Sequence, residues 1–182
     1  MTSVRQLRKS ALSHPAAVEQ DGTTTHGVTA FTVEDAQFAA VDAGGVLHLH
    51  LSAKVGADMI AAHHAAEELS GSDTSVTVCV PLNELDGQQL NYWVRQAWLF
   101  CAPNELAARA RAAETAVPGE VGDLPKTIGR PATQALVTAG MESLDQVAQL
   151  SEAELSAMHG VGPKAVRILR ETLESTGREF RH

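Results

Sequence analysis

The chain has 182 residues, of which 44% are hydrophobic and 20% are charged, and its formal net charge is −8. These values are typical of a soluble globular protein with one medium domain and a small second one, and they exclude a membrane span of roughly 20 apolar residues. The acidic balance also argues against a basic surface over the whole protein, so any nucleic-acid binding would have to come from a local patch.

Two features of the chain favour a reduced, cytoplasmic protein. No apolar block near residue 1 is typical of a secretory signal. Cys79 and Cys101 are the only cysteines, which is too few for a disulfide framework, and both stand in apolar runs. We therefore expect both thiols to be reduced core groups, and we expect no cofactor.

The first elements in chain order predict a helix followed by a meander. Residues 4–12 favour a short helix, and three runs that alternate apolar and polar residues follow. These runs are residues 27–33, 36–41 and 46–51. A Glu34-Asp35 turn separates the first run from the second, and the turn at 42–45 separates the second from the third. Short turns of this kind join neighbouring antiparallel strands.

The next part of the chain predicts a helix, a fourth strand and a long final helix. Residues 53–69 are rich in alanine and favour a helix, while residues 74–82 alternate as a strand does. Residues 87–113 favour one long helix, and its core-facing stripe has helical spacing. The stripe is Leu90, Val94, Ala97, Trp98 and Cys101. Tyr92 and Trp93 lie off this stripe and are candidates for an exposed contact.

A break in composition divides the chain in two. Residues 116–125 contain two prolines and two glycines and no apolar period. We therefore expect a domain at 1–115, a linker at 116–124 and a second domain at 125–182. The predicted fold class is α+β: a four-stranded antiparallel sheet with covering helices, followed by a small all-α helix-hairpin-helix domain.

The N-terminal pattern resembles a known family. From about His14 to Phe100, and especially in the segments 30–33, 38–41 and 45–51, the chain is similar to the MmcQ/YjbR-like proteins and the related luciferase-domain-like family. The resemblance implies an α/β domain. It implies a fold more than an activity.

One face of the predicted third strand carries side chains that could bind a ligand. His48 and His50 share a face there, opposite the leucines of the same strand, and with Thr77 they form a possible small-ligand face. Two imidazoles can also ligate a metal, but a third ligand would have to come from Cys79 or the His63-His64 pair. A solvated or cleft-lining sheet face explains these residues better, and we assign no metal site. Local signatures of an activated nucleophile are also absent, so we assign no catalytic residue and expect a protein that is not an enzyme.

The C-terminal third predicts a run of short helices. A helix should begin at Arg130-Pro131 and end at Gly140, and Ser143 and Ser151 each stand three residues before a Gln or Glu, as in a capping box. A short helix reaching Met158, a glycine turn, and a helix with Val166, Leu169 and Leu173 then follow in succession. This order predicts a helical hairpin.

The glycine turn predicts a phosphate site. Gly160, Val161 and Gly162 allow a sharp turn that leaves free N–H groups at the start of a helix, where the helix dipole favours an anion. Lys164, Arg167 and Arg170 project from that helix and could reach the same phosphates. Residues 119–182 hold seven basic and nine acidic side chains, so this part of the chain is not basic as a whole. The motif offers phosphate contact and minor-groove entry but no code for base sequence, so binding should be weak and salt-sensitive.

This segment resembles helix-hairpin-helix domains, and more closely the C-terminal domain of the RNA polymerase alpha subunit. The resemblance implies DNA contacts by Arg130 and Thr133 at the start of the first helix, and by Gly162 and Lys164 at the turn. Ala165 stands where the family often has Ser, and Pro163 lacks an N–H. The two halves together resemble the TfoX-like competence regulators, which implies a regulatory role.

The expected function is that of a non-enzymatic DNA-binding or regulatory accessory protein, whose partner is the DNA backbone without sequence preference. Two alternatives remain open at this point. The hairpin could dock on a protein, such as the transcription machinery, or the N-terminal sheet face could bind a small molecule. Neither the oligomeric state nor any membrane association is indicated.

Overall fold

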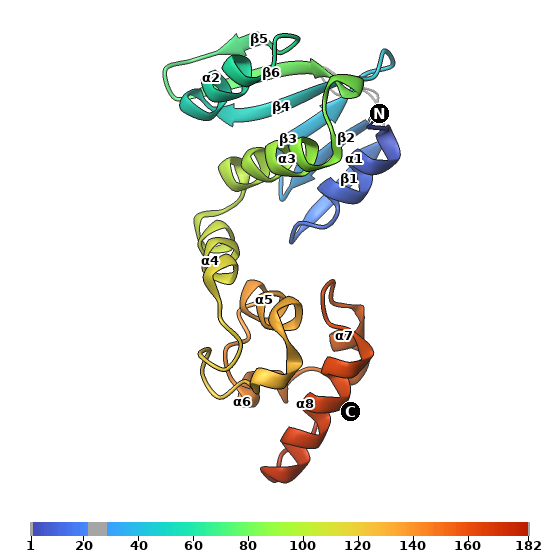
Figure 1. Cartoon of the computed structure of the whole chain (residues 1–182), viewed down its shortest axis with the longest axis vertical. Helices are drawn as coiled ribbons and strands as arrows, with labels where there is room; N and C mark the ends of the chain where they lie inside the picture. The colour runs from blue at the N-terminus through green and yellow to red at the C-terminus, as the bar shows by residue number, and fades with distance from the viewer. Residues whose placement is uncertain (1, 22–28, 182) are drawn as a thin grey trace. The chain divides into compact units, whose positions relative to one another are not determined.

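The computed structural model describes residues 2–21 and 29–181 and divides into two compact units, Met1–Pro103 and Asn104–His182 (Figure 1). The division falls before the linker expected at 116–124. It does so because helix α4 (Asn104–Thr115) packs against α5 (Arg130–Thr138), with Ala113 and Val137 in one buried cluster, and therefore belongs with the C-terminal helices.

The N-terminal unit is built on an open antiparallel sheet of six strands in the order β1-β2-β3-β4-β6-β5. The strands are β1 (Ala17–Asp21), β2 (Thr29–Val33), β3 (Ala36–Val41), β4 (Val46–Ser52), β5 (Glu67–Gly71) and β6 (Ser75–Pro81). The α+β class and the antiparallel meander β2-β3-β4 are confirmed. Gly27 and Val28, expected to begin the first predicted strand, which corresponds to β2, lie outside the described residues.

The prediction of four strands was wrong because both edge strands were missed. β5 occupies part of the helix expected over 53–69; the helix there, α2 (Ala53–Ala62), ends at His63, whose backbone is extended. All residues of β5 are exposed, so its sequence has no apolar alternation to detect. Its pairing with β6 decides its conformation, and β1 pairs with β2 in the same way at the other edge. Both are tertiary effects that override local propensity.

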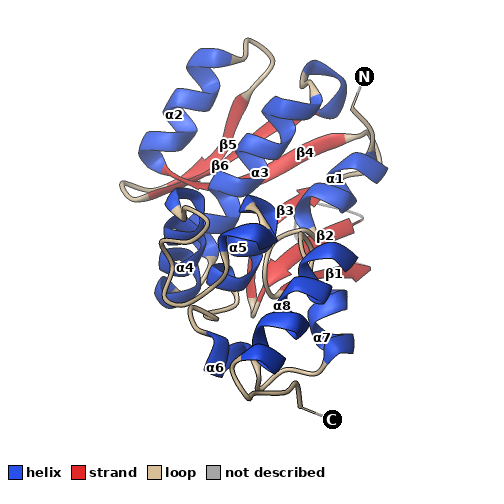
Figure 2. Cartoon of the chain, turned by 60° about the horizontal axis from the view of Figure 1, so that its bottom comes forward, coloured by secondary structure: helices blue, strands red, loops and turns tan. Residues whose placement is uncertain are grey.

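The core of this unit lies on one face of the sheet. Leu47, Leu49 and Leu51 of β4 stand opposite valines of β6 in register, and all three leucines are fully buried. Helices α2 and α3 (Gly87–Cys101) pack against the sheet, and Figure 2 shows them in front of the strands, while α1 (Val4–Ala11) packs on α3. The largest fully buried side chains of the unit are Leu7, Phe31, Phe38, Met59, Leu85, Leu90 and Trp98.

The single helix expected over 87–113 is two helices. Ala102 has an extended backbone, and Pro103 follows it and lacks the N–H that a helix would use, so α3 ends at Cys101 and α4 starts at Asn104. The buried stripe of α3 is confirmed for its residues from Leu90 to Trp98, and Cys101 is half-buried. Trp93, expected to be exposed, is only 6% exposed, whereas Tyr92 is 53% exposed.

The C-terminal unit is a compact set of short helices. After α4 come a 3-10 turn at Lys126–Ile128, α5, α6 (Leu144–Val147), α7 (Glu152–Ala157) and α8 (Pro163–Ser175). Both capping boxes are confirmed, since Ser143 and Ser151 each accept a bond from the backbone N–H three residues on. The unit's main core comprises Leu124, Ile128, Ala132, Leu136, Leu144, Val147, Leu155, Val161, Ala165, Val166, Leu169 and Leu173.

Within the described residues, no helix combines the length and the apolar character needed to cross a membrane.

Candidate functional site

The turn between α7 and α8 has the sharp geometry that its glycines predict. Gly160 has a φ of +97°, a conformation that residues with side chains rarely adopt. A Cβ atom at Gly160 would lie 3.0 Å from the carbonyl oxygen of Pro131 and 3.4 Å from the Cβ of Ala135. The turn therefore packs on the first turns of α5, next to Arg130, which brings together the two regions expected to bind DNA.

Backbone N–H groups at this turn are open. Val161 donates its N–H to the carbonyl of Met158 at 3.1 Å, which closes the turn. The amides of Gly160, Gly162 and Lys164, by contrast, have no hydrogen-bond acceptor among the described residues. Gly162 caps α8 with an extended backbone and no side-chain bond, so these donors stand at the N-terminus of a 13-residue helix. Such donors suit an anion.

Lys164 is the cation nearest these amides in sequence. Its side chain is exposed and pairs with no carboxylate among the residues that the structure describes. It lines a groove of about 660 Å³ along one side of α8, together with Thr127, Ile168, Glu171, Thr172 and Ser175. The groove is mixed in character, because Glu171 places a carboxylate in the same hollow as the ammonium.

Both arginines of α8 that were expected to bind phosphate are ion-paired within the unit. The Nε of Arg167 lies 3.7 Å from a carboxylate oxygen of Glu171, one helical turn further on. Arg170 donates a hydrogen bond to Glu152, the first residue of α7, and so links the two helices of the hairpin. Neither guanidinium is available to a ligand without giving up its carboxylate.

Three other residues expected to contact DNA are engaged within the unit. Thr133 is fully buried and donates its hydroxyl to the carbonyl of Gly129. Val161 is also buried, and its N–H closes the turn. Arg130 is exposed, but it donates to the backbone carbonyl of Glu114 at the end of α4. The sequence pattern placed these residues near the turn but could not show their partners.

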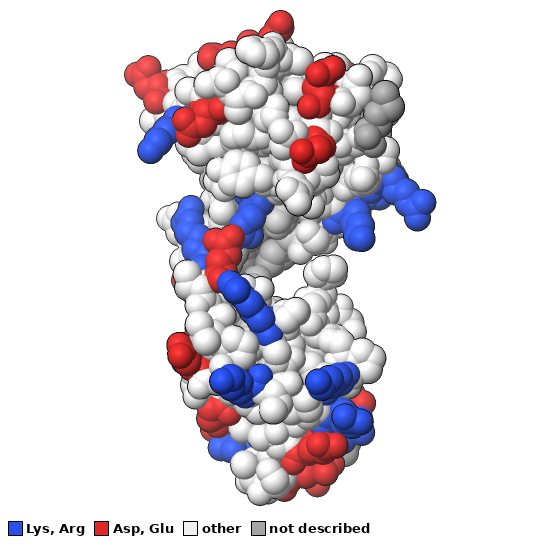
Figure 3. Space-filling view, in the orientation of Figure 1, with Lys and Arg blue, Asp and Glu red and all other residues white. Residues whose placement is uncertain are grey.

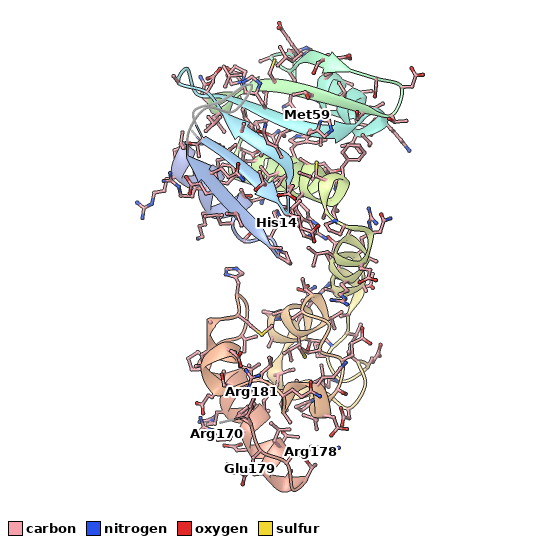
Figure 4. The ribbon with its side chains drawn as sticks, turned by 180° about the vertical axis from the view of Figure 1, so that it is seen from behind. His14, Met59, Arg170, Arg178, Glu179 and Arg181 are labelled. Carbon is pink, nitrogen blue, oxygen red and sulfur yellow. The ribbon has the colours of Figure 1, made fainter. Side chains whose placement is uncertain are left out.

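The C-terminal residues after α8 take part in the unit in a way that the sequence did not indicate. Arg181 donates to both carboxylate oxygens of Glu154, and its N–H donates to the carbonyl of Leu150 (Figure 4). Arg178 pairs with Asp145 at 2.6 Å. Hydrogen bonds from the Ser151 backbone and side chain, and then from Arg181, lower the pKa of Glu154. Each of these arginines therefore neutralises an acidic group of the same unit.

The surface of the C-terminal unit is consequently mixed rather than basic. On the face shown in Figure 3, Lys and Arg side chains of this unit alternate with Asp and Glu side chains. Any anion site here is local to the turn.

The sheet face expected to bind a small ligand is present, but its polar side chains already contact neighbouring groups. His48 and His50 lie opposite Cys79 and Thr77 on neighbouring strands, and all four side chains are half-buried. His50 lies 3.4 Å from the Thr77 hydroxyl, and its ring centroid is 5.4 Å from that of Phe100. The geometry therefore brings His50 and Thr77 together, as the sequence predicted.

His48 is engaged with the adjoining hairpin turn. Its Nε2 lies 3.5 Å from a carboxylate oxygen of Asp42. The other oxygen of Asp42 accepts the N–H groups of Gly44 and Val46. The bond from Val46, followed by those from His48 and Gly44, lowers the pKa of Asp42. This carboxylate therefore stabilises the turn.

The extra ligands considered for a metal are used elsewhere. His63 accepts a 2.9 Å hydrogen bond from the indole N–H of Trp93, which also explains why that tryptophan is buried. Cys79 donates weakly to the Glu67 carbonyl, and burial raises the pKa of the Cys101 thiol to about 12. Within residues 2–21 and 29–181, no group of three or more His, Cys, Asp or Glu side chains is placed to hold a metal ion.

Comparison of the chain with family models, with curated proteins and with solved structures finds no match in any of the three.

Proposed function

We propose that the protein is a non-enzymatic DNA-binding or regulatory accessory protein, and that its helical hairpin binds the backbone of DNA. The observation that carries this proposal is the set of three backbone amides, those of Gly160, Gly162 and Lys164, that have no acceptor among the described residues and stand beside the Lys164 ammonium. A phosphate oxygen would accept from these donors, as anions do at helix N-termini.

The chemistry predicts weak binding without sequence preference. Amides at a helix N-terminus recognise phosphate oxygens, which every DNA sequence shares. Lys164 is the one cation of α8 without a carboxylate partner among the described residues, and Arg130 donates to the backbone carbonyl of Glu114. With Lys164 alone making the contact, the turn should neutralise about one phosphate, which corresponds to a slope of about −0.9 in log K against log salt concentration. The N-terminal unit would then serve as the regulatory or partner-binding part.

The test is fluorescence anisotropy of a short labelled DNA duplex titrated with the full chain at several salt concentrations. We expect measurable binding at low salt that weakens as salt increases. Lys164→Ala should weaken binding to all sequences alike and reduce the salt slope by about 1.

Lys54→Ala provides the matched control, because Lys54 is an exposed lysine on α2 in the other unit. It removes the same charge and should leave the slope unchanged. Binding that is insensitive to salt and to Lys164→Glu would reject the proposal and favour the docking of a protein on the hairpin.

A further inference from the structure

Three basic residues of α8 form a row that starts at the turn. Lys164, Arg167 and Arg170 are spaced three residues apart, which advances the row about 4.5 Å along the helix at each step and turns it about 60° around the axis. A row of this kind could follow several phosphates of one strand. Only the first member, however, lacks a carboxylate partner among the described residues.

Glutamates neutralise the other two members from two different elements. Glu171 holds Arg167 from within α8, and it also lines the groove that contains Lys164. Glu152 holds Arg170 from the start of α7. Figure 4 shows Arg170 on α8, in the same region as the C-terminal arginines.

We infer that Glu152 and Glu171 limit the affinity for DNA by keeping Arg170 and Arg167 from phosphate. The inference rests on the function proposed above and names the residues that restrict that site to one phosphate. All four side chains are exposed, at 44% to 67%, so the arginines are within reach of DNA, but a phosphate must first displace a carboxylate, which reduces the net gain from each contact. Removing the carboxylates would extend the cationic row from one member to three.

The experiment measures the salt slope of duplex binding for the full chain and for its Glu152→Gln, Glu171→Gln and doubly substituted variants. Glutamine keeps the size of the side chain and removes its charge. We expect each single substitution to steepen the slope by about 0.9, and the double substitution to change it from about −0.9 to about −2.7, with tighter binding at low salt.

Glu174→Gln is the matched control. Glu174 is an exposed glutamate of the same helix with no ion pair among the described residues, so it reports the general effect of removing one negative charge. A second check introduces Arg170→Gln into the wild-type chain and into the Glu152→Gln variant. Arg170→Gln should cost little affinity in the wild-type chain, and it should abolish the gain in affinity that Glu152→Gln produces.

The outcomes separate this inference from the proposed function. Binding by the wild-type chain with a slope that the double substitution leaves unchanged, or that Glu174→Gln steepens equally, overturns the inference alone. A wild-type slope already near −2.7 also overturns it, because the arginines would then be engaged. Absence of duplex binding by the wild-type chain and by every variant overturns the proposed function itself.

Discussion

The two units differ in how their polar groups are satisfied. In the N-terminal unit, each strand is hydrogen-bonded to its neighbours in the sheet, and side-chain donors such as the indole of Trp98 bond to backbone carbonyls. In the C-terminal unit, one turn leaves backbone amides open while most of the surface arginines are ion-paired. The comparison teaches that the better candidate site comes from unsatisfied backbone at a turn, and not from the more conspicuous histidines of the sheet.

Because each unit has its own core, we expect a core substitution in one unit to leave the stability of the other unchanged. The largest expected effect is the loss of stability caused by a substitution at Trp98. Trp98 is fully buried, and we expect Trp98→Ala to destabilise the N-terminal unit by about 3–5 kcal/mol. Both tryptophans of the chain lie in this unit, so the fluorescence of Trp93 reports its unfolding in urea, while far-UV circular dichroism reports the helices of both units.

Leu169→Ala is the reciprocal change, since Leu169 is fully buried in the C-terminal core. It should move the dichroism transition and leave the fluorescence transition in place. If Leu169→Ala shifts the fluorescence transition as well, the units unfold as one and cannot be perturbed separately.

A pH effect confined to the N-terminal unit comes next in size. His14 stacks on Trp98 with ring centroids 5.2 Å apart, and burial, helped by the charge of Arg95, lowers its pKa from 6.5 to about 4. The unfolded chain therefore binds a proton more readily than the folded one. The free energy of unfolding of the N-terminal unit is therefore highest above about pH 6.5. It decreases as the pH falls toward 4, by at most about 3 kcal/mol.

Urea unfolding followed by tryptophan fluorescence at neutral and acidic pH measures this loss. His14→Phe keeps a ring against Trp98 and removes the titrating group, so its stability should depend less on pH over this range. An equal loss in the variant would show that other groups cause the acid effect.

The smallest effect concerns the turn itself. Gly160→Ala introduces a Cβ at a φ of +97° and 3.0 Å from the Pro131 carbonyl oxygen, and we expect it to destabilise the C-terminal unit by about 1–3 kcal/mol and to weaken DNA binding. Far-UV circular dichroism in urea and duplex anisotropy measure the two results.

Gly162→Ala is its matched control. Gly162 has a φ of −84°, and a Cβ there would meet no atom within 4 Å. Its effect on stability should stay within about 1 kcal/mol. Equal losses at both glycines would contradict the packing of Gly160 on α5.

Sequence alone determined the features that depend on neighbours along the chain. The caps Ser143 and Ser151, the alternation of residues 46–51 and the glycine turn before Pro163 all describe hydrogen bonds or faces formed within a few residues, and the structure has each of them. The break at Pro103 belongs to the same class, because proline acts locally, and it could have been predicted.

Only the tertiary structure decided the features that depend on distant partners. The edge strand β5 forms because β6 offers it a pairing edge, and Trp93 is buried because His63 accepts its N–H. Thr133 is lost from the candidate site because it lies in the core, and Arg170 is restrained because Glu152 on another helix reaches it. Residue type and spacing specify which side chains a segment presents, but hydrogen bonds and ion pairs between segments depend on distances that form only when the chain folds.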